Sequence, residues 1–160
     1  MKRQTKTIGS QRFVGAWTGY CAALWALIFS LLHVVWAAGW YIGLPEEQAR
    51  RAFQRTWFLA YDLVIAGMCG LAVPVALALV QPWGQRLPRR LLSVLAWCGT
   101  GLLVLRGGGA LAQTVYLVAA GKYIPEPMHL YTVRFCLGAV LFGLSLWRFR
   151  RASPTPLDTA

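Results

Sequence analysis

Four long apolar stretches run along the chain, and short polar segments separate them. An α-helix needs about 20 mostly apolar residues to cross the hydrocarbon core of a bilayer, and each stretch is long enough. The pattern therefore predicts an all-α integral membrane protein whose single domain covers residues 13–147. The expected transmembrane helices cover residues 13–41, 57–80, 91–120 and 129–147.

Short connections between the four stretches favour an up-down antiparallel four-helix bundle. The first apolar run is too long for the core of a cleaved signal peptide, which spans roughly 7–15 residues, so it is expected to stay as a helix. Small residues on each helix predict surfaces where helices approach closely. These surfaces contain Gly39 and Gly43, Ala66 and Gly70, Gly99 and Gly101, and Gly138 and Ala139.

The positive charges predict the orientation of the bundle. The 160 residues carry a net charge of +11. Ten Lys and Arg residues lie in the N-terminal segment, the second connection and the C-terminal segment, whereas four lie in the first and third connections. Because positive residues favour the cytoplasm, both termini are expected on the cytoplasmic side of a cell membrane. Residues 1–12 and 148–160 are then cytoplasmic, and the lipid bilayer is the first partner.

Other classes of site find little support in the sequence. The basic residues cluster at helix ends and form no continuous basic face, which argues against nucleic acid. The four cysteines are spread along the chain without a C-x-x-C pair, which argues against a zinc or redox site. Motifs for nucleotide binding or hydrolysis do not occur. We therefore predict neither a metal nor a cofactor.

Ionisable residues inside apolar helices are costly and are functional candidates for that reason. His33, Asp62, Arg106 and Arg134 are the four such residues. In the antiparallel arrangement all four fall in the outer half of the membrane, which predicts one polar pocket there. Further polar candidates at similar depth or nearby in the sequence are Gln113, Glu126, His129 and Tyr131.

The first helix carries an aromatic stripe that contains the histidine. Trp25, Phe29, His33, Trp36 and Trp40 are spaced by three or four residues and so share one helical face. The stripe predicts either a partly apolar pocket wall or ordinary packing and anchoring at the membrane interface.

Each polar candidate also has a structural interpretation. Asp62 could pair with Arg106 or Arg134 and fix helix register, and His33 could be an interhelical hydrogen-bonding residue. Glu126 and His129 could belong to a solvated loop. The glycines at 107–109 could loosen the third helix or let it pack closely.

Three short motifs resemble a family of small four-helix membrane proteins, domain-of-unknown-function family 3995. The first is His33-Val-Val-Trp36-Ala-Ala-Gly39-Trp40, which departs from the family pattern by having Trp40 in place of a second glycine. The others are Leu105-Arg106-Gly107 and Phe135-Cys136-Leu137-Gly138. The resemblance covers residues 15–147 and implies a fold but no activity.

The favoured hypothesis is a membrane-embedded enzyme with isomerase- or cyclase-like acid–base chemistry on a lipophilic substrate. Asp62 and His33 are the candidate catalytic residues. One alternative is a protein that binds or transports a lipophilic or anionic small molecule, either as a dimer or as part of a larger membrane complex. Another alternative is a structural subunit. A haem held by His33 and His129 is a minor fourth option. The candidate substrate-binding residues are Arg106, Arg134, Trp36, Trp40, Gln113, Tyr131, Glu126 and His129.

Overall fold

The computed structural model describes residues 5–122 and 126–151, with side chains at 16–122 and 132–151. Helices are the only regular secondary structure in the described part, and four of them are long and apolar enough to cross a membrane. The prediction of an all-α protein with four transmembrane helices is therefore confirmed. The elements are α1 (Thr5–Ala37), α2 (Glu46–Phe53), α3 (Thr56–Ala78), the 3-10 helix η1 (Pro82–Arg86), α4 (Arg89–Ala119) and α5 (Glu126–Arg151).

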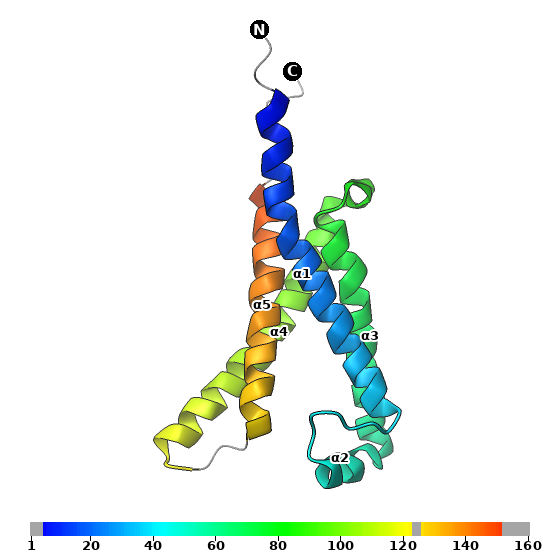
Figure 1. The fold of residues 1–160 in the computed structure, drawn as a ribbon, viewed down its shortest axis with the longest axis vertical. Coiled ribbons are helices and arrows are strands. Elements are labelled where there is room, and N and C mark those ends of the chain that lie inside the picture. Colours follow the sequence, from blue (N-terminus) through cyan, green and yellow to red (C-terminus); the bar gives the residue numbers. More distant parts are fainter. Residues whose placement is uncertain (1–4, 123–125, 152–160) are drawn as a thin grey trace.

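The long helices run up and down as two hairpins. α1 packs mainly on α3 and α4 mainly on α5, while α1 also contacts α5. The start of α1, the end of α5 and η1 lie at one end of the molecule, and α2 lies at the other (Figure 1). We call these the terminal end and the distal end. The two hairpins come together towards the terminal end and diverge towards the distal end (Figure 1).

Most large apolar side chains point away from the protein interior. Leu24, Leu71 and Leu105 are examples of the many that are exposed. A soluble monomer rarely exposes so large an apolar surface, whereas lipid tails cover such a surface at no cost. The interior is built largely from small residues, and its two clusters centre on Ala22, Ala23, Ala26, Ala76 and Phe142, and on Ala78, Leu79, Leu92, Ala96 and Leu146.

Gly107 and Gly138 are among the glycines that allow close contact between helices. A Cβ atom at Gly138 would lie 2.6 Å from Cζ2 of Trp25, and one at Gly107 would lie 3.3 Å from the backbone of Cys136. Gly107 thus serves the close packing of α4 on α5, and α4 continues as a helix through residues 107–109. Gly99 and Gly101 have no neighbour within 4 Å of such an atom among the described residues, so the close-approach surface predicted for them is wrong.

The first helix ends earlier than predicted. It stops at Ala37 instead of continuing to residue 41. Gly39 has a φ of 94° and Gly43 a φ of 76°, and this left-handed backbone, which glycine adopts readily, turns the chain out of the helix. Trp40 therefore follows the helix instead of extending its aromatic stripe, and it is 71% exposed.

The helix α2 was not predicted from the sequence. Its salt bridges join residues four positions apart: Arg50 to Glu46 at 2.7 Å and Arg51 to Glu47 at 3.7 Å. The hydrogen bond to Glu46 and the charge of Glu46 raise the pKa of Arg50. These pairs neutralise two of the basic residues at the distal end.

The contact between Gly138 and Trp25 gives a first test of the packing. Trp25 is stacked on Phe29 at 4.9 Å and meets the edge of Phe142 at 6.4 Å, so its ring has little freedom to move away. We expect Gly138→Ala to destabilise the protein by about 1–3 kcal/mol relative to Gly101→Ala. Both changes raise helix propensity equally, so the difference in thermal unfolding in detergent isolates the clash. Equal melting temperatures for the two variants would contradict this packing.

Candidate functional site

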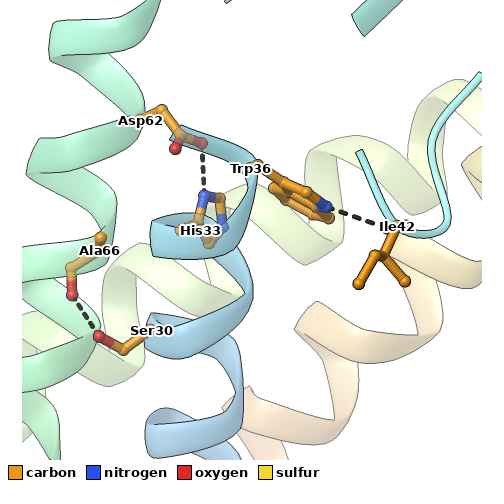
Figure 2. Close-up of polar contacts among 6 residues, drawn as sticks. All are labelled: Ser30, His33, Trp36, Ile42, Asp62 and Ala66. Carbon is orange, nitrogen blue, oxygen red and sulfur yellow. Dashed lines mark hydrogen bonds and ion pairs between the residues drawn. The ribbon is translucent and has the colours of Figure 1, made fainter. Parts of the chain in front are cut away.

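A histidine and an aspartate meet between α1 and α3. His33 lies near the C-terminal end of α1 and Asp62 near the N-terminal end of α3, and the antiparallel pairing of these helices brings them to the same level. Nδ1 of His33 lies 2.6 Å from Oδ1 of Asp62 (Figure 2). A carboxylate oxygen accepts a hydrogen bond from an imidazole N–H, and we assign the donor role in this contact to Nδ1–H of His33. We call this pair the His33–Asp62 dyad.

A second polar contact joins the same two helices about one turn away. The hydroxyl of Ser30 donates a hydrogen bond of 2.8 Å to the backbone carbonyl of Ala66 (Figure 2). Ser30 is three residues before His33 and Ala66 is four residues after Asp62, so each pair shares one helical face. Ser30 was not among the residues predicted for the site, although its spacing from His33 was a usable signal.

Both members of the dyad are buried and retain unused hydrogen-bonding capacity. His33 is 7% exposed and Asp62 is 4% exposed. Nε2 of His33 and Oδ2 of Asp62 are buried without a hydrogen-bond partner among the described residues. A buried polar atom without a partner costs free energy and calls for an explanation. A ligand that supplies a donor or an acceptor is one such explanation.

Other buried or half-buried hydroxyl groups behave differently. Thr100, Thr114 and Ser145 each donate to the carbonyl four residues earlier in their own helix. These bonds satisfy the hydroxyls locally and leave the helix surface free for packing. Compared with them, the dyad joins two helices and leaves one polar atom on each side chain without a described partner.

Aromatic rings flank the imidazole on its own helix. The ring centroid of His33 lies 5.1 Å from that of Phe29 and 4.8 Å from that of Trp36. Trp36 is itself held in place, because its indole N–H donates to the carbonyl of Ile42 at 2.9 Å (Figure 2). The stripe predicted from the sequence is thus present from Trp25 to Trp36.

The two arginines lie on the other hairpin. The guanidinium of Arg106, on α4, lies 4.9 Å above the ring of Phe135, and this ring lies 5.4 Å from Phe29. Arg134, on α5, is half-buried and has an interaction partner of its own. The interpretation of Asp62 as the ion-pair partner of an arginine is wrong, because Asp62 faces α1 across the hairpin and bonds to His33.

The remaining predicted site residues divide into two groups. Trp40 and Gln113 are exposed, in the turn after α1 and on α4. The side chains of Glu126, His129 and Tyr131 lie outside the described side chains. The structure therefore brings His33, Asp62 and Trp36 together on one hairpin, and connects Arg106 to them only through the rings of Phe135 and Phe29.

The dyad has the chemical form of an oriented base. A histidine whose Nδ1–H is bound to a carboxylate has a fixed ring and tautomer, and its Nε2 is then an acceptor. The carboxylate also stabilises the imidazolium that forms when Nε2 takes a proton. Within the described part of the chain, no three metal-binding side chains come together.

One protein-family model matches a region of the chain that contains all or part of each of these helices. The model of the family described as protein of unknown function (DUF3995) matches residues 26–149, which include both members of the dyad. The chain belongs to this family. The membership agrees with the motifs around His33, Arg106 and Phe135, and the family description names no activity. Neither the curated proteins nor the solved structures contain a match to this chain.

A double-mutant cycle tests the bond between His33 and Asp62. Each single change, His33→Leu or Asp62→Leu, leaves one buried polar group without its partner, and we expect each to cost about 1–3 kcal/mol. The double variant should lose less than the sum, with a coupling energy of about 1 kcal/mol. The measurement is equilibrium unfolding in mixed detergent micelles.

The control for this cycle pairs His33→Leu with Thr100→Val. The Thr100 hydroxyl bonds within α4, so the effects of these two changes should be additive. A coupling energy near zero for His33 and Asp62, or one equal to that of the control pair, would contradict the dyad.

Proposed function

We propose that this protein is a membrane-embedded acid–base enzyme that isomerises a lipophilic substrate drawn from the bilayer. The observation that carries the proposal is the buried imidazole, bonded to Asp62 through Nδ1 and without a described partner at Nε2. Such an arrangement is suited to proton transfer, because the base is oriented and its reactive nitrogen is available.

The proposed reaction moves one proton within the substrate. Nε2 of His33 takes a proton from a carbon next to a double bond or a carbonyl group, and the resulting imidazolium is stabilised by Asp62. The same nitrogen then returns the proton to another carbon, so that substrate and product are isomers. The reaction needs no oxidant, reductant or cofactor, and the enzyme ends in its initial protonation state.

The surroundings of the dyad favour an apolar substrate. Phe29 and Trp36 flank the imidazole, and rings of this kind exclude water and contact a hydrocarbon skeleton. Arg106 and Arg134 are proposed to hold the polar end of the substrate, since an arginine binds a carboxylate or phosphate through two parallel hydrogen bonds. This role is supported by the contact from Arg106 through Phe135 to Phe29.

The proposal includes the orientation in a cell membrane. Both termini are assigned to the cytoplasm, which puts the dyad in the outer half of the bilayer. The excess of Lys and Arg at the terminal end supports this assignment. The pairing of Arg50 and Arg51 with glutamates at the distal end also supports it.

A second candidate function is purely structural. The dyad and the Ser30–Ala66 contact both join α1 to α3, so together they could serve only to fix the register of this hairpin. In this case a double change of His33→Leu with Asp62→Leu alters only the stability of the hairpin. For an enzyme, the same double variant folds but has lost its activity.

Solvent deuterium provides a test in which the substrate does not have to be identified beforehand. An isomerised lipid is recognised by a changed chromatographic retention at equal mass, and by deuterium at carbon when the imidazolium exchanges its proton with D2O during turnover. Proteoliposomes that contain the protein and extracted membrane lipids are incubated in D2O, and the lipids are then surveyed by mass spectrometry. We expect a lipid that becomes labelled, with a rate lower by roughly 10²–10⁴ in His33→Ala and Asp62→Asn.

Ser30→Ala is the matched control for this experiment. It removes the neighbouring contact between α1 and α3 but leaves the dyad intact, so labelling should continue at nearly the original rate. The enzyme hypothesis fails if no lipid is isomerised or labelled above a liposome blank, or if both dyad variants isomerise and label lipids as fast as the unchanged protein.

A further inference from the structure

One charged side chain in the interior of a membrane span has no direct charged partner among the described residues. Arg106 lies near the middle of α4, and its side chain is exposed. It lies on the ring of Phe135, 4.9 Å from the ring centroid, and makes no ion pair or hydrogen bond with the described residues. Because a charge inside a span is costly, an exposed guanidinium at this depth indicates a ligand.

The carboxylates of the chain are placed elsewhere. The five acidic residues are Glu46, Glu47, Asp62, Glu126 and Asp158. The first three have basic partners of their own. Glu126 begins α5 nine residues before Phe135, so about 13 Å of helix separates its backbone from the level of this ring. Asp158 follows the end of α5 and lies outside the described residues. A direct partner for the guanidinium of Arg106 therefore has to come from another molecule.

The surface of α4 beside this guanidinium is open. Gly109 is three residues after Arg106 and so lies on the same face of the helix. A Cβ atom at Gly109 would have no described neighbour within 4 Å. A guanidinium that lies on an aromatic ring also keeps N–H donors at its edge, where they can bind an anion. The head of a ligand can thus approach both the donors and the helix at this point.

Phe135 connects the guanidinium to the dyad on the other hairpin. Its ring lies 4.9 Å from the guanidinium carbon of Arg106 and 5.4 Å from the ring of Phe29. Phe29 in turn lies 5.1 Å from the imidazole of His33. Three contacts between neighbouring groups, two of them between apolar rings, therefore separate a cation from the proposed base. A molecule with an anionic head and a long hydrocarbon chain can reach from one to the other.

The charge and the depth of Arg106 indicate which anion fits. One guanidinium balances the single charge of a carboxylate, which it binds through two parallel hydrogen bonds. A phosphate monoester carries about 1.5 to 2 negative charges at neutral pH. Phospholipid headgroups lie at the membrane surface, whereas Arg106 lies near the middle of its span. A compact carboxylate at one end of a hydrocarbon chain meets both conditions.

We propose that the substrate of this protein is a long-chain carboxylic acid whose carboxylate binds Arg106. Of the two arginines assigned to the polar end of the substrate, Arg134 has an interaction of its own, so Arg106 takes the charge. The hydrocarbon chain extends past Phe135 and Phe29 towards His33. The identity of this acid as a substrate rests on the proposed function, whereas its binding to Arg106 does not.

Binding of oleic acid to the full chain tests the site. The protein is purified in a neutral detergent at mildly alkaline pH and titrated with oleic acid or with its methyl ester, which lacks the charge. Native mass spectrometry counts the retained ligands. We expect the unchanged protein to retain the acid in preference to the ester. Arg106→Gln should lower the affinity for the acid about tenfold or more, whereas Arg106→Lys, which keeps the charge, should lower it less.

Arg55→Gln is the matched control. It removes the same charge from an exposed arginine that precedes α3, outside the interior of a span, so the affinity for oleic acid should not change. The double change His33→Leu with Asp62→Leu should also retain the acid, because the dyad does not bind the carboxylate. This variant separates the two proposals, since a protein without isomerase activity would still bind the acid through Arg106.

Three results would overturn the proposed site. The first is equal retention of the acid and the ester by the unchanged protein, which does not depend on whether any variant folds. The second is an affinity for the acid that Arg106→Gln leaves unchanged, or that Arg55→Gln lowers as much. The third is displacement of the acid by an equimolar amount of phosphatidylglycerol, which would indicate a site for lipid headgroups instead.

Discussion

Inside a bilayer, a polar side chain has to find its partner within the protein, because the surrounding lipid offers none. This constraint accounts for most polar contacts described here. Thr100, Thr114 and Ser145 meet it by bonding within their own helices. The α1–α3 hairpin meets it differently, by placing an imidazole, a carboxylate and a hydroxyl where they bond across the helix interface. Its register therefore depends on polar contacts as well as on packing.

The dyad satisfies this constraint incompletely. One nitrogen of His33 and one oxygen of Asp62 are used, and the second atom of each is buried without a described partner. An apolar pair of similar volume would hold the two helices together without this cost. The cost is understandable if the unused atoms act on a ligand, and this is why the enzyme hypothesis is favoured over a purely structural role.

Sequence patterns predicted the features that depend on the length of apolar stretches and on the helical spacing of side chains. The four spans follow from apolar length, and the stripe from Trp25 to Trp36 follows from helical spacing. The partner of Asp62 could not be predicted, because spacing identifies the face of a helix but not the helix that packs against it. The end of α1 depends on the left-handed backbone of Gly39 and Gly43, and α2 is too short for a search based on apolar length.

The lateral arrangement of the polar residues could not be predicted for a related reason. The order of helices in an antiparallel bundle fixes the depth of each residue, and it puts His33, Asp62, Arg106 and Arg134 in the half away from the terminal end. Depth does not specify lateral position. The structure separates these residues between two hairpins that diverge towards the distal end (Figure 1). Before they diverge, the aromatic contact from Phe29 to Phe135 connects α1 to α5.

This division has a mechanical consequence for the dyad. Both of its residues belong to the α1–α3 hairpin, so their hydrogen bond does not depend on how the second hairpin is placed. The surroundings of the imidazole do depend on it, because Phe29 contacts both His33 and Phe135. A movement of one hairpin against the other would thus alter access to Nε2 while Asp62 continued to orient the ring. In the proposed reaction, this arrangement would keep the base aligned while a bulky lipophilic molecule enters and leaves.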